Sequence, residues 1–277
     1  DHLYDNWTIP KKNGDPRQVC GPQPRLKRLQ RRLLDRVLSK EKVHRNAHGF
    51  VPGKSIVSNA RQHLKQDVVI NLDLADFFPS TSRQLVFTTL CSIKDVTHEL
   101  AGFLADVCCY QGALPIGAPT SPCIANLVLR SFDKAMTTAA RKIGAKYTRY
   151  ADDLTISGSE DCLKLISFAK YLLEKKGYSL NERKINVFRP GRRQVVTGLT
   201  VNKKVSVPRA IRRKLRAALH ARELGNQPTW AGRPSDDRQL AGLCSFVRSI
   251  NRREGNRLLK SLRRQPVCEL SKESASK

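Results

Sequence analysis

Two adjacent aspartates, Asp152 and Asp153, are the residues of this sequence that point most directly to chemistry. They lie in the segment Tyr150-Ala151-Asp152-Asp153, between the runs YTRY and LTIS, which predict a β-hairpin with the carboxylates at its turn. Neighbouring carboxylates repel each other, so the pair calls for a bound cation. Because aspartate is also a common turn residue, the pair alone is equally consistent with a solvated loop tip.

A second carboxylate site favours the chemical interpretation. The run VVINLDL, residues 68–74, predicts a buried strand that carries Asp73 near its end. A charge in an apolar strand is costly unless it is paired or bound to a metal. If this strand lies beside the hairpin, Asp73 and Asp152 point at one spot with Asp153 close by, and such oxygen ligands suit Mg²⁺. The pattern predicts a two-metal site for nucleotidyl transfer, in which one ion activates the attacking hydroxyl and the other holds the triphosphate.

The charge of the chain predicts a polyanionic partner. There are 51 Lys and Arg against 24 Asp and Glu, a formal net charge of +27. A membrane is disfavoured, because no apolar run approaches the ~18 residues of a spanning helix and neither a signal-like segment nor a lipidation motif is present. Residues 65–160 carry nine Lys and Arg against ten Asp and Glu, whereas residues 203–264 carry seventeen against four and residues 1–46 twelve against five. A near-neutral centre with basic arms fits an enzyme on a nucleic-acid track better than a histone-like or ribosomal binder.

Length and cysteine content bound the architecture. With 277 residues and 40% hydrophobic content, the chain can bury a sizeable core as one large domain or several subdomains. The eight cysteines contain no CxxC pair, which disfavours zinc and favours reduced core thiols in a cytoplasm. The chain does not begin with Met, so we expect N-terminal residues to be missing, and the polar end ELSKESASK is expected to be disordered.

Basic side chains near the N-terminus lie in two expected elements. Residues 7–20 predict a β-hairpin around Asn13-Gly14. Its cations Lys11, Lys12 and Arg17 could grip a triphosphate, Arg17 through a bidentate contact. The run RLKRLQRRLLDRVL, residues 25–38, has leucines at helical spacing, and its basic face is equally consistent with simple solvation.

Two further predicted helices carry residues that are consistent with either a structural or a functional role. Residues 55–66 predict a helix with Asn59 and His63 on one face, where a lone histidine is more often a hydrogen-bonded structural residue. The loop LPIGAPTSP, residues 114–122, predicts a helix start with Ser121 as N-cap and Pro122 in the first turn, running on towards Gly144. The same small-residue loop would let a flat base pair approach the backbone.

The C-terminal part predicts a basic helical region. A helix around residues 164–176 ends at Gly177, and two strands then flank Val196-Thr197-Gly198. The next helix starts at Ser206-Val207-Pro208 and has an apolar stripe of Ile211, Leu215 and Leu219. A charged face opposite such a stripe is usually only solvated, but four arginines make this one a candidate phosphate-contact face: Arg209, Arg212, Arg213 and Arg216.

These segments, in this order, resemble the reverse transcriptases, and most closely the bacterial retron reverse transcriptases, over residues 4–262. IPKKNGDPR is similar to the fingers hairpin, INLDLADFFPS to the first catalytic strand, LPIGAPTSP to the loop under the templating pair, YADD to the catalytic hairpin and NERK to the following Lys-bearing segment. The NAxxH pattern at residues 59–63 and the VTG element at 196–198 narrow the resemblance to retrons. Intron-encoded, diversity-generating and CRISPR-associated reverse transcriptases are the neighbouring alternatives. Ile116 departs from the pattern, because many relatives have Gln before this glycine.

The resemblance implies an α+β right-hand polymerase fold with fingers, a palm with an antiparallel sheet and a helical thumb. Fingers would comprise residues 1–66 and 83–117, palm 67–82 and 118–202, and thumb 203–268, with a disordered tail at 269–277. Asp73, Asp152 and Asp153 would be the catalytic metal ligands, with the Leu74 backbone. Nucleotide contacts would come from Lys11, Lys12, Arg17 (the triphosphate clamp), Asp76, Phe77, Phe78 (under the sugar), Gly117 and Lys184 (a phosphate contact or proton donor). Nucleic-acid contacts would come from Asn59, His63, Pro119, Ser121, Thr197, Gly198, Arg209, Arg212, Arg213 and Arg216.

The activity that the resemblance implies is RNA-directed DNA polymerisation of retron type in the bacterial cytoplasm. The enzyme would use two Mg²⁺ ions, with Mn²⁺ as a substitute, and dNTPs to copy part of a cognate structured non-coding RNA. Priming from a 2′-hydroxyl of that RNA would give a branched RNA–DNA product (msDNA) and an RNA–DNA hybrid, in anti-phage defence. The alternative is a scaffold of the same fold that binds RNA or hybrid and sequesters an effector (toxin) protein; an Mg²⁺-dependent extension assay separates the two.

Overall fold

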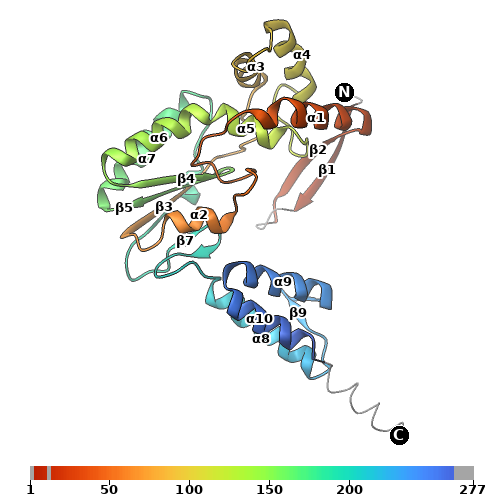
Figure 1. Cartoon of the computed structure of the whole chain (residues 1–277), viewed down its shortest axis with the longest axis vertical. Helices are drawn as coiled ribbons and strands as arrows, with labels where there is room; N and C mark the ends of the chain where they lie inside the picture. Colours follow the sequence, from red (N-terminus) through yellow and green to blue (C-terminus); the bar gives the residue numbers. More distant parts are fainter. Residues whose placement is uncertain (1–2, 11–13, 265–277) are drawn as a thin grey trace. The chain divides into compact units, whose positions relative to one another are not determined.

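The structure is a computed structural model that describes residues 3–10 and 14–264 (Figure 1). The chain divides into two compact units, a first unit of Asp1–Thr197 and a second unit of Gly198–Lys277. The boundary falls in the turn between the short strands β7 (Val195–Val196) and β8 (Leu199–Thr200), where Thr197 and Gly198 have φ of 45° and 81°. This confirms the predicted turn between two strands.

An antiparallel four-stranded sheet forms the centre of the first unit. Its strand order is β4-β5-β3-β6, with β3 (Val68–Asp73), β4 (Lys146–Tyr150), β5 (Asp153–Gly158) and β6 (Asn186–Phe188). The predicted strand is β3, and it is central: its apolar residues are buried because β5 and β6 pair with its two edges while helices cover the sheet. Helices α6 (Arg130–Lys142) and α7 (Lys164–Glu174) lie side by side on one face, and α2 (Ile56–Gln62) lies on the other (Figure 1).

The remaining elements of the first unit surround the N-terminal hairpin. Strands β1 (Tyr4–Pro10) and β2 (Pro16–Pro22) pair antiparallel and confirm the predicted hairpin; residues 11–13 lie outside the described part. Buried Gln30 joins three elements, because its Nε2 donates to the Tyr4 hydroxyl at 2.9 Å and to the Val107 carbonyl at 2.8 Å. The other helices are α1 (Pro24–Arg36), α3 (Arg83–Cys91), α4 (His98–Cys108), α5 (Ser121–Val128) and the 3₁₀ turns Leu38–Lys40, Glu160–Leu163 and Glu182–Lys184.

Two predicted helix boundaries are wrong. The helix after the 114–122 loop starts at Ser121, not after it, because the Ser121 hydroxyl donates to the Pro115 carbonyl rather than capping the helix. It also does not continue to Gly144: the buried residue Leu129, with ψ near 2°, separates α5 from α6. Gly144 does end α6, with φ of 68° and the Ala145 N–H donating back to Ala140.

The helix predicted at residues 55–66 is shorter in the structure. Ser55 caps it by accepting from the Ser58 N–H, and His63 already occupies the C-cap position. Lys65 follows with φ of 55°, a left-handed conformation that ends helical geometry. The element itself is therefore confirmed and its C-terminal end is wrong.

The second unit is a small helical body with its own core. It contains α8 (Arg209–Glu223), α9 (Asp237–Ile250), α10 (Arg252–Leu262) and the short strands β9 (Thr229–Trp230) and β10 (Arg233–Pro234). The predicted stripe is confirmed, since Leu215 and Leu219 are buried with residues of α9 and α10 and Ile211 packs against them. Gly255 permits the close approach of α10 to α9, because a Cβ there would lie 2.2 Å from the Arg248 Cα.

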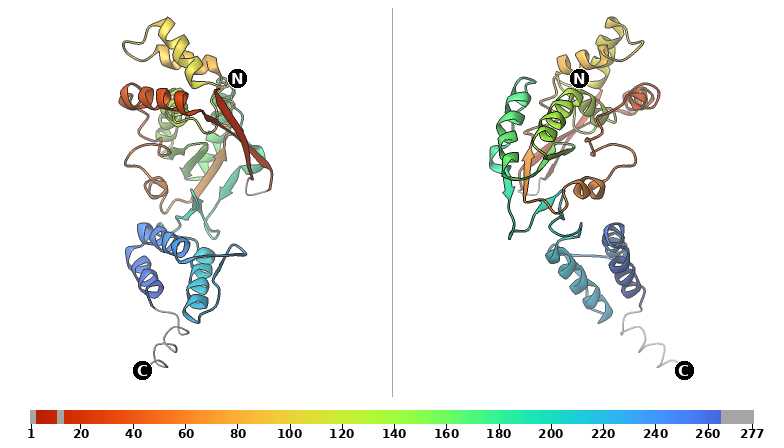
Figure 2. Two further views of the ribbon diagram at one scale, coloured as in Figure 1. Left: turned by 90° about the vertical axis from the view of Figure 1, so that its right-hand side faces the viewer. Right: turned by 60° about the vertical axis from the view of Figure 1, so that its left-hand side comes forward.

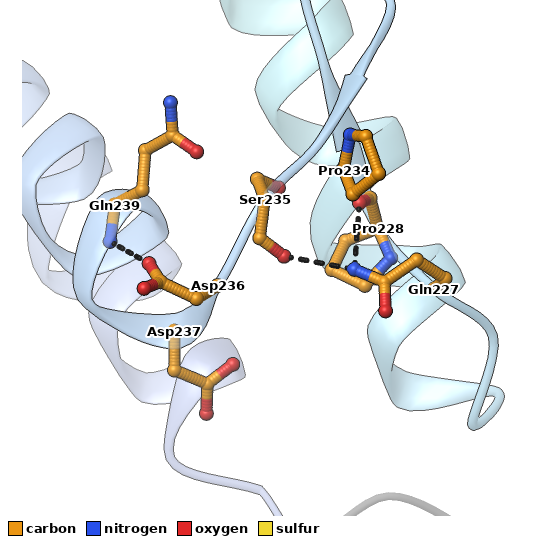
Figure 3. Close-up of a pocket in the computed structure, with 7 residues that line it drawn as sticks. All are labelled: Gln227, Pro228, Pro234, Ser235, Asp236, Asp237 and Gln239. Carbon is orange, nitrogen blue, oxygen red and sulfur yellow. Dashed lines mark hydrogen bonds between the residues drawn. The ribbon is translucent and has the colours of Figure 1, made fainter.

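The start of α9 is fixed by local hydrogen bonds (Figure 3). The Asp236 carboxylate accepts from the Gln239 N–H at 2.7 Å, which caps the helix. The Gln227 amide donates to the Ser235 carbonyl at 3.1 Å and so holds the two ends of the β9–β10 hairpin together. Asp237 is bound by Arg222 through two contacts of 2.6 Å.

Two findings concern the whole described part of the chain. Among residues 3–10 and 14–264, no helix combines the length and the apolar character that a membrane span requires. The seven cysteines in those residues are free thiols, as expected, and burial raises the pKa of Cys108 to about 11.

Candidate active site

A cavity of about 550 Å³ in the first unit brings together most of the predicted catalytic residues. Its walls come from β2, the end of β3, the loop that follows β3, the tip of the β4–β5 hairpin and the segment before β6. The predicted residues that line it are Arg17, Asp73, Leu74, Asp76, Phe77, Phe78, Asp152 and Lys184. Gln18, Phe50, Ile116 and Asn181 also line it and were not predicted as site residues.

The strand register places the carboxylates. Strand β3 pairs with β5 so that Asp73 lies opposite Asp153, which confirms that the Asp73 strand lies beside the hairpin. Tyr150 also pairs with Asp153, so Ala151 and Asp152 form a two-residue turn. The Leu74 N–H donates to the Asp152 carbonyl at 3.1 Å and ties the end of β3 to this turn. Asp73 and Asp152 therefore face the same cavity.

Electrostatics at this point favour a cation. Burial raises the pKa of Asp152, and the nearby Asp73 carboxylate raises it further, while Lys184 and Arg17 oppose the shift. The Lys184 ammonium lies 2.7 Å from Asp73 Oδ2, and this hydrogen bond raises the pKa of Lys184. In this structure Asp73 is thus paired with the positive charge of Lys184.

The donor set fits a divalent metal through Asp73 and Asp152. Asp153 lies close by, as predicted, because its backbone pairs with that of Asp73. Within residues 3–10 and 14–264 no group of three or more His, Cys, Asp or Glu side chains is arranged to hold one ion, so a shared metal-ligand role of all three carboxylates stays a prediction. Asp153 is exposed and does not line the cavity. The two carboxylates that do share the cavity are hard oxygen donors of the kind Mg²⁺ prefers.

A buried ion pair supports the β4–β5 hairpin. Arg149 and Asp133 are both fully buried, with Arg149 Nε and Nη2 at 2.9 and 2.7 Å from the two carboxylate oxygens. The Tyr147 hydroxyl donates to Asp133 at 2.7 Å. Burial alone would lower the pKa of Arg149, but the Asp133 carboxylate raises it above its ordinary value, so the guanidinium stays charged.

This ion pair reaches the turn that carries Asp152. Arg149 Nη1 donates to the Ala151 carbonyl at 3.0 Å and to Asn126 Oδ1 at 2.9 Å, and Asn126 donates in turn to the Gly49 carbonyl. A Cβ at Gly49 would lie 2.3 Å from the Ala151 nitrogen, so only glycine fits there. Ala151 itself has φ of 57°, a strained value for a residue with a side chain. The turn conformation is therefore held by contacts from α5 and from residues before α2.

The two phenylalanines after β3 have different environments. Phe77 is 5% exposed and packs in the core, although it also lines the cavity, so its role as a nucleotide contact stays a prediction. Phe78 is half-buried, and its ring centroid lies 5.1 Å from that of Phe77 and 6.2 Å from that of Phe50. This confirms that one ring packs inside while the other faces the cavity. Phe50, with φ of 58°, is an aromatic neighbour that no sequence pattern indicated.

Three predicted nucleic-acid contacts are contradicted by burial. His63 is fully buried, and its ring nitrogens lie 2.7 Å from the Ser157 and Thr148 hydroxyls. Burial lowers the pKa of His63 to about 3, so the ring is neutral and structural. Asn59 is also fully buried and Ser121 is 1% exposed. None of these side chains has surface to offer a nucleic acid.

Other predicted residues keep their status as predictions. Lys11 and Lys12 lie outside the described residues. Gly117 is exposed with φ of 128°, and the loop around it is bound to the N-terminal hairpin through the Cys20 N–H and the Ile116 carbonyl. Pro119 is half-buried. The Thr197 hydroxyl donates to the Ile56 carbonyl at 3.2 Å, which joins the VTG turn to the start of α2.

The predicted basic face of α8 is only partly free. Arg209, Arg213 and Arg216 are exposed. Arg212 is instead half-buried, with Nη1 3.2 Å from both carboxylate oxygens of Glu254 on α10. The interpretation of Arg212 as a phosphate contact is therefore corrected to an ion pair within the second unit.

Comparisons with known proteins agree with this site. A family model described as reverse transcriptase (RNA-dependent DNA polymerase) matches residues 9–207. The retron Mx162 reverse transcriptase of Myxococcus xanthus is 36% identical, over 94% of this chain and 60% of that protein. The retron Mx65 reverse transcriptase of the same organism is 38% identical, over 95% of this chain and 64% of that protein. The retron Ec86 reverse transcriptase of Escherichia coli is 31% identical, over 94% of this chain and 80% of that protein. The chain therefore spans less than two thirds of the length of the two Myxococcus relatives.

Solved structures share the fold at low sequence identity. The apo telomerase from Candida tropicalis has a TM-score of 0.57 at 9% identity, over 94% of this chain and 57% of that one. A foamy viral protease-reverse transcriptase has a TM-score of 0.50 at 16% identity, over 88% of this chain and 36% of that one. Together with the family match, these likenesses confirm the predicted α+β right-hand polymerase fold.

Proposed function

Because this chain belongs to the reverse transcriptase family, and within it to the retron reverse transcriptases, we propose that it is an RNA-directed DNA polymerase of retron type. The observation that carries the proposal is the cavity that Asp73 and Asp152 line together with Arg17, Lys184 and Phe78. We assign the palm to residues 67–82 and 118–202, the fingers to 1–66 and 83–117 and the thumb to 203–268.

Each side chain of the cavity has a role that its chemistry supports. Asp73 and Asp152, with Asp153 and the Leu74 backbone adjacent, would hold the divalent ions. When bound, two Mg²⁺ ions, or Mn²⁺ in their place, lower the pKa of the attacking hydroxyl and neutralise the triphosphate. Arg17 clamps the triphosphate from β2. Phe78 lies under the sugar, and Lys184, next to Asp73, contacts phosphate or donates a proton to the leaving group.

The finer part of the proposal concerns template and priming. Similarity to retron reverse transcriptases supports copying of a cognate structured non-coding RNA, primed from a 2′-hydroxyl of that RNA, to give branched RNA–DNA. We place this synthesis in the bacterial cytoplasm and in anti-phage defence, with an effector protein as a partner. The rival scaffold role is disfavoured because the cavity retains its carboxylates, which binding alone does not require.

Primer extension tests the activity. The purified protein is incubated with a primed RNA template, labelled dNTPs and Mg²⁺, beside a reaction with EDTA. We expect labelled DNA only with the metal, and with the cognate RNA alone we expect a product that keeps a short RNA branch after ribonuclease treatment. Absence of any metal-dependent extension on a bound RNA template would support the scaffold instead. Extension from an added primer without a branched product would support DNA polymerisation and contradict the proposed priming from an RNA 2′-hydroxyl.

A further inference from the structure

A second cavity, of about 410 Å³, lies where α1 leaves the N-terminal hairpin, and the two elements diverge from this point in the left view of Figure 2. Trp7 and Gly21 of the hairpin line it, together with Lys27, Arg28 and Arg31 of α1. It shares no lining residue with the cavity that holds Asp73 and Asp152. We propose that this cavity binds an unpaired nucleotide of a single-stranded nucleic acid, with the base stacked on Trp7 and its phosphates beside the three cations.

Trp7 is held as a rigid platform. A Cβ at Gly21 would lie 2.6 Å from Trp7 Cη2 and 2.8 Å from Cζ3, so one face of the indole rests on the glycine backbone. The residue is nonetheless 48% exposed, an unusual position for a large aromatic side chain. A ring that is fixed on one face and open on the other can stack a base with little loss of conformational entropy.

The cations of α1 have no structural task that explains them. Lys27, Arg28 and Arg31 are exposed, and within the described part of the chain they make no side-chain hydrogen bond or ion pair. Arg31 lies four positions after Lys27 and three after Arg28, so it is a neighbour of both on the helix surface and repels each by a few tenths of a kcal/mol. Placed around an aromatic platform, they complement the phosphates on either side of a stacked base.

The chemistry of the lining selects this ligand over others. Duplex nucleic acid keeps its bases stacked on each other and offers phosphates alone, which leaves the indole without a partner. A protein partner with an apolar surface would leave three cations unmatched. Asp5 is the single carboxylate in the lining, so the cavity stays net positive. The inference adds a binding site for a strand outside the catalytic cavity and does not depend on polymerase activity.

Tryptophan fluorescence tests the proposal directly, because the chain has two tryptophans and a Trp230→Phe variant leaves Trp7 as the reporter. The variant is titrated with single strands of about ten nucleotides, within the site sizes of single-strand binders. Oligothymidylate and oligouridylate should quench Trp7 emission, and a hairpin duplex should quench it much less. An abasic strand of equal length carries the same phosphates and should leave the emission unchanged. Equal quenching by the abasic strand or the duplex would overturn the proposal.

Charge variants in the same background test the phosphate contacts. Arg28→Gln with Arg31→Gln should weaken the quenching titration and lower the slope of log affinity against log salt by about 1.4, since each single-strand contact contributes roughly 0.7. The control is Arg25→Gln with Arg36→Gln, which removes the same charge from exposed positions of α1 outside the cavity and should leave the titration unchanged. Equal effects of the two pairs, or strand binding without any quenching, would refute the site.

Discussion

The two units of this protein use charge in opposite ways. In the first unit the decisive charges are buried and partnered: Arg149 and Asp133 are completely inaccessible and hold the turn that carries Asp152. In the second unit the charges are numerous and mostly exposed, as Arg209, Arg213 and Arg216 show. A buried pair fixes geometry, because any displacement leaves an unpaired charge in a low dielectric. An exposed row attracts a polyanion without specifying its sequence. We therefore propose that the first unit sets the position of the reacting groups and that the second contributes affinity for the nucleic acid.

The largest expected effect concerns the buried ion pair of Arg149 and Asp133 in the first unit. We expect Arg149→Met to lower the free energy of unfolding by about 3–5 kcal/mol, because Asp133 is left buried without its partner. Urea denaturation followed by circular dichroism measures this change. The control is Arg189→Met, which removes a pair with Glu160 whose side chains are 53% and 59% exposed and should cost at most about 1 kcal/mol. Similar losses in the two variants would contradict a special role of burial.

Phe78 tests whether the cavity is shaped for a deoxyribose. Since its ring faces the cavity while Phe77 packs in the core, Phe78→Ala should admit a 2′-hydroxyl and raise the use of ribonucleotides relative to deoxyribonucleotides by roughly tenfold. The ratio of kcat/KM for the two nucleotide classes is the measurement. A folded, active variant with unchanged discrimination would assign Phe78 to packing.

The exposed charges of the second unit should give the smallest effect. Arg209→Gln with Arg213→Gln should flatten the dependence of log RNA affinity on log salt by about one to two units and weaken binding to unrelated RNAs equally. Filter binding across a salt series measures the slope. Arg212→Gln provides the contrast: because Arg212 pairs with Glu254, it should affect the stability of the second unit and leave the slope unchanged. A parental slope in the double variant would mean that this face is only solvated.

Local sequence patterns predicted the helices and strands well, but they did not predict the buried polar contacts. The hairpin around YADD, the strand at 68–73 and the apolar stripe of α8 follow from periodicity and turn chemistry, which operate over a few residues. The neutral role of His63 depends on Ser157, 94 residues away, and no local pattern encodes that contact. Arg149 gave a signal that could have been read: an arginine between two tyrosines in a strand flanked by apolar runs demands a buried partner.

The same limit applies inside the candidate site. Sequence spacing identified Asp73 and Asp152, because carboxylates in an apolar strand and at a hairpin turn are costly without a function. Lys184 was predicted only from the resemblance to reverse transcriptases. Phe50 reaches the cavity from a segment far away in the chain and belongs to no motif. Asn181 opens the NERK segment, in which only Lys184 was predicted as a site residue. Exposure of Asp153 also depends on the register of β5, which the sequence did not define.

The most direct test of the account is primer extension by an Asp73→Asn variant beside an RNA-binding titration. An amide keeps the shape of the side chain and cannot replace an anionic metal ligand. The control is Asp67→Asn, the same substitution at an exposed residue just before the opposite end of β3. The account predicts no detectable DNA synthesis by Asp73→Asn, with RNA affinity close to that of the parent, and normal synthesis by Asp67→Asn. Near-normal extension by Asp73→Asn would contradict the assignment of this cavity as the catalytic site.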